Sequence, residues 1–270
     1  MKPFAILQTV ALAPARVAYA LWVLVAFLAI GICTLLLLVV LPEVTQRRGA
    51  ARAAARTFLR AAGMPLTLRF PERLPQDQCV VVCNHASYID GIVLTAALPA
   101  RFGFVIKREM AAVPLAGALL RRLRSEFVER FDRQRGASDA RRVLRNAIRG
   151  HSLVFFPEGT FTRRPGLLKF HTGAFTTATR AACPLVPAVL RGTRRALRPG
   201  GALPRPGPIE MEILPPLAPG ASDEHAAPEL RDCARAAILA ALGEPDLTCC
   251  DDTDRPPDTA PARSARVSRP

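Results

Sequence analysis

The sequence predicts a single α/β domain, a mixed sheet flanked by helices, preceded by an N-terminal transmembrane helix. From about residue 65, short apolar runs that are typical of buried strands alternate with helix-like segments. Before them, residues 17–41 form an apolar run without a charged side chain, and about 20 such residues are enough to cross a bilayer. The 270 residues leave room for one ordinary domain beside this helix. We therefore expect a membrane anchor at 1–45, an α/β domain at 46–247 and a disordered tail at 248–270.

The apolar run at 17–41 is predicted to be an uncleaved anchor rather than a signal peptide. A signal peptide has an apolar core of about 7–15 residues followed by a small-residue cleavage site, whereas this run is longer and is followed by Pro42 and Glu43. Upstream of it lie only Lys2 and Arg16, while five arginines follow between residues 47 and 60. Because positive charge is retained on the cytoplasmic side, the sequence predicts a single-pass protein of the cytoplasmic (inner) membrane whose domain faces the cytoplasm.

Four of these arginines, Arg48, Arg52, Arg56 and Arg60, recur every fourth residue. On a helix this spacing forms one basic stripe. Two interpretations remain open: an ordinary solvated helix face, or a surface that rests on anionic lipid headgroups beside the anchor.

The remaining elements follow from local patterns. Ser138 can cap a helix that ends at Gly150, and a closing helix is expected near the end of the domain. The final segment, 248–270, is rich in Asp, Pro, Arg and Ser and has little to bury, which is typical of disorder. The predicted strands are 79–83, 103–106, 126–128, 153–156 and 185–190, and the predicted helices are 138–149 and 229–242.

The net charge of +15 favours an anionic partner, namely nucleic acid, an anionic membrane surface or a phosphorylated substrate. Aromatic residues make up only 6% of the chain and no recognised nucleic-acid-binding motif is present, so we expect no nucleic-acid partner. A basic, membrane-tethered nucleic-acid-binding protein is retained as the non-enzymatic alternative. The seven cysteines are irregularly spaced without a C-x-x-C pair, which favours reduced buried thiols and no metal site, although His85 follows Cys79 and Cys83.

The first segment with catalytic potential is 84–90, Asn-His-Ala-Ser-Tyr-Ile-Asp, directly after the strand at 79–83. His85 and Asp90 would lie on different faces of one straight helix. If His85 instead lies in the loop and Asp90 in the first turn of the next helix, the carboxylate can accept a hydrogen bond from one imidazole nitrogen and leave the other free to take a proton. This arrangement is the base and orienting half of a catalytic triad, with the nucleophile supplied by the substrate. The competing interpretation is a histidine that only packs at a strand end.

A second polar segment, 157–164, follows the strand at 153–156. Glu158 is an acidic residue at a strand end, and Gly159 would allow a ligand to approach the backbone closely. Arg163 and Arg164 can hold a phosphate or another anion. The competing interpretation is a plain β-turn with surface arginines.

Taken in order, these segments resemble the glycerolipid acyltransferase superfamily, whose best-known members are the 1-acylglycerol-3-phosphate O-acyltransferases. The resemblance covers roughly residues 65–195 and rests on four blocks and one short strand, none of which is highly specific alone. The blocks are Asn84-His85 through Asp90, Lys107-Arg108-Glu109 with Pro114 and Gly117, Phe156 to Thr160, and Val186 to Val189; the strand is Phe127 to Arg130.

The resemblance implies an O-acyltransferase of phospholipid biosynthesis that moves a fatty acyl group to the hydroxyl of a lysophosphatidate-like lysophospholipid. His85 would be the general base and Asp90 its orienting partner. The donor would be acyl-CoA or acyl carrier protein, acting as a substrate, and no cofactor is expected. The partners would be that donor and membrane phospholipid or lysolipid. The substrate-binding residues would be Asn84, Lys107, Glu158, Gly159, Thr160, Arg163 and Arg164, with no metal ligand.

One departure from the family pattern concerns the acceptor. Many members that make phosphatidate have an arginine directly after Glu-Gly-Thr, whereas this chain has Phe161 there and its arginines only at 163 and 164. Either Arg163 replaces that cation or the acceptor differs, so lyso-ornithine lipid and lysophosphoethanolamine stay open as acceptors. A lipid hydrolase and a carrier-independent phospholipid transacylase are further alternatives. A covalent route through Ser87 or Cys83 is also open, although neither lies in a G-x-S-x-G turn.

Overall fold

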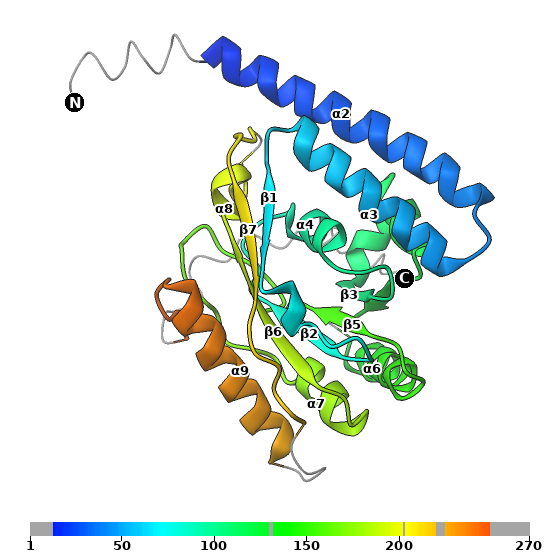
Figure 1. The fold of residues 1–270 in the computed structure, drawn as a ribbon, viewed down its shortest axis with the longest axis vertical. Helices are drawn as coiled ribbons and strands as arrows, with labels where there is room; N and C mark the ends of the chain where they lie inside the picture. Colours follow the sequence, from blue (N-terminus) through cyan, green and yellow to red (C-terminus); the bar gives the residue numbers. More distant parts are fainter. Residues whose placement is uncertain (1–12, 130–131, 202, 220–224, 249–270) are drawn as a thin grey trace, which may run out of the picture.

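A computed structural model describes residues 13–129, 132–201, 203–219 and 225–248. These residues form a seven-stranded sheet in the order β1-β7-β6-β2-β5-β3-β4, with helices on both faces (Figure 1). The strands are β1 Leu66–Arg69, β2 Val80–Cys83, β3 Gly103–Lys107, β4 Glu126–Val128, β5 Leu153–Phe155, β6 Leu185–Arg191 and β7 Ile209–Ile213. The helices are α2 Ala13–Val40, α3 Val44–Ala61, α4 Asp90–Ala97, α5 Ala116–Arg122, α6 Arg133–Ile148, α7 Gly173–Arg180, α8 Thr193–Ala196 and α9 Ala226–Leu242, with short 3₁₀ turns η1 Pro71–Arg73 and η2 Arg108–Ala112.

The sheet is mixed, which confirms the predicted fold class. β2 is central and pairs in parallel with β5 on one side and β6 on the other, whereas β6 and β7 are antiparallel. The carboxyl ends of β2, β5 and β6 therefore meet at one edge of the sheet. In open α/β sheets this is the edge at which ligands bind.

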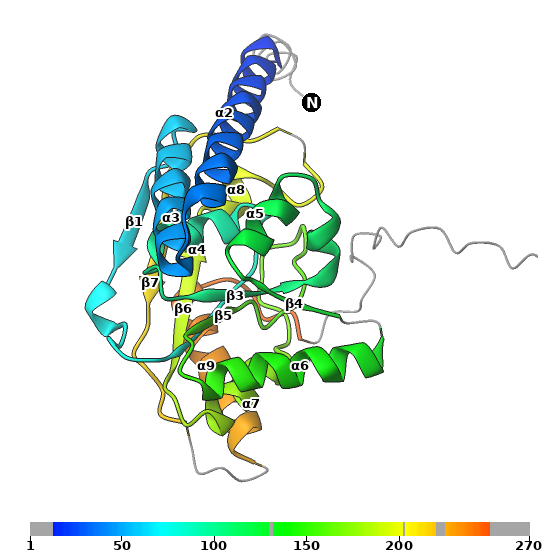
Figure 2. The same ribbon diagram turned by 90° about the vertical axis from the view of Figure 1, so that its right-hand side faces the viewer.

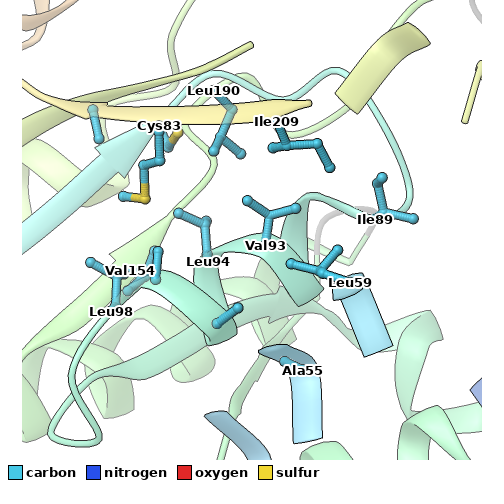
Figure 3. Packing of buried hydrophobic residues seen from close by; sticks show 14 of the residues in the cluster. Ala55, Leu59, Cys83, Ile89, Val93, Leu94, Leu98, Val154, Leu190 and Ile209 are labelled. Atoms are coloured by element: carbon cyan, nitrogen blue, oxygen red, sulfur yellow. The ribbon is translucent and has the colours of Figure 1, made fainter. Parts of the chain in front are cut away.

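Alternating side chains of the central strands fill two cores. Val81 and Cys83 of β2 face α3 and α4, whereas Val80 and Val82 face α7 and α9. α4 lies between α3 and the sheet, and Val93 and Leu94 fill that layer (Figure 3). All four β2 residues are buried, so β2 provides a rigid support for the loop that follows it.

α2 is the one described helix that is long and apolar enough to cross a membrane, over Pro14–Val40. One flank of it packs along α3, and the two helices lie side by side in both views (Figures 1 and 2). Near its start, the Tyr19 hydroxyl donates to the carbonyl of Ala62 across 2.6 Å. Further along, the Phe27 and Phe58 rings meet edge to face at 5.7 Å. The outer flank remains apolar and exposed, as Val25 (59% exposed) and Leu36 (64% exposed) illustrate.

Three arginines of the α3 stripe bind backbone carbonyls of their own chain. Arg56 donates to the carbonyl of Ala96 across 2.8 Å and Arg52 to that of Ala97 across 3.2 Å, both in the last turn of α4. Arg48 donates to the carbonyl of Arg101 across 3.0 Å and also to that of Leu123. Cations at the carboxyl end of a helix stabilise its unpaired carbonyls and its dipole. Most of the stripe therefore binds other parts of the same domain, with Arg52 and Arg56 joining α3 to α4. Neither interpretation made from the sequence included these contacts.

Several elements differ from the sequence-based predictions. α6 begins at Arg133, one turn before the predicted start, because Asp132 and not Ser138 is its cap: the Asp132 carboxylate accepts the backbone N–H groups of Gln134 and Arg135. Two of the described cysteines, Cys33 and Cys233, are exposed, so the prediction of buried thiols is wrong for them, although all the described cysteines are free. Residues 1–12 of the predicted anchor and 249–270 of the predicted tail lie outside the described residues.

Candidate active site

His85 and Asp90 lie at the carboxyl end of β2, where the strand passes through a short loop into α4. The imidazole Nδ1 and the Asp90 Oδ2 are 2.7 Å apart. The same oxygen accepts the backbone N–H groups of Ala86 and Ser87 across 2.6 and 2.8 Å. Asp90 is fully buried and is the first residue of α4, where the helix dipole favours a negative charge. A carboxylate held by these donors keeps the proton on Nδ1 and leaves Nε2 as the basic nitrogen.

Glu158 joins the second strand-end segment to the first. Its Oε1 accepts the backbone N–H of His85 across 2.6 Å, and its Oε2 accepts the backbone N–H of Leu168 across 2.9 Å. β2 and β5 pair in parallel with Val82 opposite Phe155, so the loops that follow the two strands begin side by side. The 3% exposed Glu158 side chain thus fixes the backbone of His85 and the end of its own loop.

Burial raises the pKa of Glu158 to about 8. The two backbone N–H groups and the nearby Arg194 act in the opposite direction, because they stabilise the charged form, but desolvation is the larger effect. The carboxyl group therefore changes its charge near neutral pH while in direct contact with the backbone of His85.

Asn84 ties the same loop to the third strand. Its amide nitrogen donates to the carbonyl of Leu190 across 3.1 Å, and its oxygen accepts the Leu190 N–H across 2.7 Å. This pair of bonds extends the β2–β6 pairing by one side chain. The amide nitrogen and oxygen are thus occupied within the protein, which supports a positioning role for Asn84 rather than direct contact with a substrate.

The two residues considered for a covalent route are poorly suited to it. The Ser87 hydroxyl is buried and donates to the carbonyl of Leu197 across 2.7 Å. The Cys83 thiol is fully buried, and this burial raises its pKa well above the ordinary value, which disfavours the reactive thiolate. A nucleophile supplied by the substrate fits this geometry better.

The other predicted substrate-binding residues lie at or after the ends of the neighbouring strands β3 and β5. Lys107 ends β3, which pairs in parallel with β5, and is exposed. Gly159 has a φ of 72° and turns the chain after Glu158 by donating its N–H to the carbonyl of Phe156. Thr160 is half-buried, and Arg163 and Arg164 are exposed. The Arg163 guanidinium lies against Gly200.

Comparison with known proteins identifies the domain that holds this site. The Acyltransferase family model matches residues 65–191, which include β1 to β6 and both strand-end loops. Residues 65–191 are the part of the chain that matches this family, and we call them the acyltransferase domain. It is 27% identical over 188 residues to a 1-acyl-sn-glycerol-3-phosphate acyltransferase of Cocos nucifera, covering 68% of this chain and 61% of that protein. It is 32% identical over 133 residues to a lyso-ornithine lipid O-acyltransferase of Pseudomonas aeruginosa, covering 48% of this chain and 49% of that protein.

The fold of the acyltransferase domain has a counterpart among solved structures. The crystal structure of the 1-acyl-sn-glycerophosphate (LPA) acyltransferase PlsC from Thermotoga maritima matches with a TM-score of 0.70 at 21% identity, over 85% of this chain and 95% of that chain. The chain spans only 49–61% of the length of the two curated relatives named above. The likeness to the solved structure establishes the shared architecture.

Aromatic rings surround the base of the acyltransferase domain. Phe156 stacks on the His85 imidazole at 4.2 Å between centroids, and Phe161 contacts it at 4.4 Å with an interplanar angle of 67°. Tyr88 then meets Phe161 edge to face at 4.8 Å. From the sequence, Phe161 was notable only because it stands where many family members have an arginine. The contact between Phe161 and His85 depends on how the loops after β2 and β5 fold together.

Arg194 of α8 holds the loop that carries Phe161, a role that no sequence pattern indicated. Its guanidinium donates to the carbonyls of Thr162 and Arg164 across 2.7 and 2.9 Å. The other terminal nitrogen donates to Glu244 across 3.1 Å. Glu244 in turn accepts the backbone N–H of Gly166. The segment after α9 therefore helps to fix one wall of the site in the acyltransferase domain.

Proposed function

We propose that this protein is a membrane-associated O-acyltransferase of phospholipid biosynthesis. It transfers a fatty acyl group from acyl-CoA or acyl carrier protein to the hydroxyl of a lysophosphatidate-like lysophospholipid. The observation that carries this proposal is the 2.7 Å contact between His85 and the buried Asp90 at the carboxyl end of β2. The Acyltransferase family match over residues 65–191 supports the same reaction class.

In the proposed mechanism, His85 Nε2 takes the proton of the acceptor hydroxyl as its oxygen attacks the thioester carbonyl. Asp90 stabilises the imidazolium that forms and keeps its orientation. The tetrahedral oxyanion collapses, the C–S bond breaks, and the thiolate receives the proton from His85. General-base assistance of this kind contributes about 10²–10⁴-fold to the rate, and positioning of the two substrates supplies much of the remainder.

Lyso-ornithine lipid is the second candidate acceptor. Phe161, and not a cation, packs against the base here, and one relative is named a lyso-ornithine lipid O-acyltransferase. The exposed Lys107, Arg163 and Arg164 around the same edge support an anionic group on either the acceptor or the donor.

The experiment that tests the reaction uses membranes that contain the protein. Labelled acyl-CoA and acyl carrier protein are each offered with lysophosphatidate, lysophosphoethanolamine and lyso-ornithine lipid, and products are identified by mass spectrometry. A new diacyl lipid that depends on the protein supports the proposal and identifies acceptor and donor. Turnover of phospholipid without any thioester donor would indicate a transacylase, and release of free fatty acid alone would indicate a hydrolase.

We propose further that α2 attaches the protein to the cytoplasmic membrane with the domain on the cytoplasmic side. The arginines that follow the apolar run support this orientation. Since α2 packs along α3, a membrane-crossing α2 must either carry α3 to the same depth or release it.

A variant that retains only the exposed Cys233 tests the orientation in intact bacterial cells. An impermeant maleimide should label it only after lysis, and labelling of intact cells would contradict the orientation.

A further inference from the structure

The imidazole of His85 is enclosed on most sides. Asp90 occupies Nδ1, Phe156 covers one ring face at an interplanar angle of 17°, and Phe161 contacts the ring from another direction. The His85 side chain keeps only 17% of its exposure. Most of the imidazole surface is therefore covered by protein atoms.

The rings form a continuous file from the core to the surface, in the order Phe156, His85, Phe161, Tyr88. Phe156 packs against the apolar core between the sheet and α4. Tyr88, at the other end, is 61% exposed. Phe161 is thus the ring that separates the base from solvent on this side, and Tyr88 supports it from outside.

Hydrogen bonds within the protein hold the backbone next to Phe161. Arg194 binds the carbonyls of Thr162 and Arg164, which follow Phe161 in the chain, and Glu244 holds Arg194 from the other side. The backbone that carries Phe161 is therefore anchored, and the ring itself packs between His85 and Tyr88.

An acyltransferase that relies on a general base must discriminate against water. The same imidazole nitrogen that accepts a proton from a lipid hydroxyl can accept one from water, and bulk water greatly outnumbers the lipid. A water molecule needs two to four polar partners to occupy a buried position, and phenyl rings supply none. A lipid hydroxyl arrives on an apolar body that can pack against those rings, so an aromatic wall favours the lipid.

We propose that Phe161 is a specificity-determining residue that excludes water from His85 and so sets the ratio of acyl transfer to thioester hydrolysis. This inference rests on the proposed acyltransferase function. Without the ring, water attacks the thioester carbonyl and gives its proton to His85. The C–S bond breaks, the thiolate takes that proton, and the products are a free fatty acid and the thiol.

The test measures both products in one reaction of the purified full chain with palmitoyl-CoA and lysolipid in mixed micelles. The variants Phe161→Leu, Phe161→Ala and Phe161→Ser remove increasing amounts of apolar surface from the same position. We expect the ratio of free palmitate to diacyl lipid to rise in that order, by at least about tenfold for alanine, since loss of an apolar contact changes selectivity by roughly 10–200-fold. Phe161→Leu should stay within a few-fold of the wild type.

Two further variants test whether hydrolysis uses His85 and whether its increase depends on a ring that contacts His85. His85→Ala combined with Phe161→Ala should abolish hydrolysis as well as transfer, because both reactions use the same base. Tyr88→Ala should raise the ratio less than Phe161→Ala, because Tyr88 does not contact the base in the file of rings.

A ratio that stays unchanged across the Phe161 series, with transfer and hydrolysis lost in proportion, would overturn this inference and leave the proposed function intact. Hydrolysis that persists without His85 would also overturn it. Absence of thioester turnover by the wild type with every acceptor would instead overturn the proposed function and this inference with it.

Discussion

The carboxylate of Glu158 accepts the backbone N–H of His85 across 2.6 Å, although the two residues are 73 positions apart in the chain. This bond makes the loops after β2 and β5 one unit. The second carboxyl oxygen of Glu158 accepts the N–H of Leu168 and so closes the loop that contains Phe161. The geometry of the base therefore depends on a buried carboxyl group whose two oxygens bind backbone N–H groups.

Replacing Glu158 with glutamine tests how this carboxyl group affects stability. A glutamine side chain has one acceptor oxygen, and its NH₂ group faces one of the two N–H donors. A buried donor that loses its partner costs about 1–3 kcal/mol, so Glu158→Gln should be less stable than the wild type at pH 5. Thermal unfolding in detergent, followed by circular dichroism, measures the difference.

The same comparison has a predicted pH dependence. The unfolded carboxyl group titrates near 4.5 and the folded one near a pKa of about 8, so between these values the folded protein binds the extra proton. The contribution of Glu158 is therefore fully present below pH 4.5 and falls as pH rises to about 8, by up to about 1.4 kcal/mol per pH unit. Glutamine removes this slope, so the stability of the wild type relative to Glu158→Gln should fall steadily between pH 5 and pH 8. A relative stability of the wild type that rises over this range would contradict the assignment.

Asp90→Asn should reduce the rate of acyl transfer by about 10²–10⁴-fold with little change in KM for the acceptor. The neutral amide can still accept backbone N–H groups, but it no longer stabilises the imidazolium that forms during the reaction. The measurement is kcat and KM for transfer. Asp232→Asn, at an exposed position of α9, is the matched control and should behave as the wild type. Equal rates for both variants would exclude the orienting role of Asp90.

Arg56→Met should lower the free energy of unfolding by about 1 kcal/mol, or 2–4 °C in Tm for a chain of this size. The lost interaction is the hydrogen bond to the carbonyl of Ala96 at the end of α4. Arg60→Met is the control, because Arg60 lies on the same stripe and binds no carbonyl within the described part of the chain. If both variants shift Tm equally, the stripe acts through its overall charge and not through contacts with α4.

Arg194→Gln should loosen the loop between Glu158 and Leu168. The bond between Arg163 and Arg164 lies in that loop, so trypsin should cleave it several-fold faster when the guanidinium no longer binds the carbonyls of Thr162 and Arg164. Arg195→Gln, the exposed neighbour in α8, is the matched control. Mass spectrometry of the fragments gives the cleavage rate at this bond, and equal rates in the two variants would exclude the clamp.

The sequence predicted the central strands and the loops at their ends because the signals are local. The apolar run of β2 leads directly into the His85 segment, and that of β5 leads into Glu158. β1 and β7 were missed, although the alternation Ile-Glu-Met-Glu-Ile in β7 is typical of a half-buried strand. Their pairing at one end of the sheet joins residues more than a hundred positions apart, which local patterns do not show.

The contacts that shape the site were harder to predict. Glu158 lies behind His85 because the parallel register of β2 and β5 aligns their ends, and local sequence patterns do not show that register. Arg194 is one arginine in a strongly basic chain, and its role depends on α8 folding back over the loop after β5. The stripe on α3 was evident as a period of four, whereas its carbonyl partners in α4 follow only from packing.

The role of His85 as the base is tested most directly by acyl transfer to the preferred lysolipid with three matched proteins. They are the wild type, His85→Ala, and His151→Ala at an exposed histidine outside the site. Diacyl lipid is quantified by mass spectrometry, and folding of each protein is checked by its Tm. We expect His85→Ala to lose transfer by at least about 10²-fold and His151→Ala to match the wild type. A folded His85→Ala protein that retains most of its transfer activity would contradict the assignment of His85 as the base.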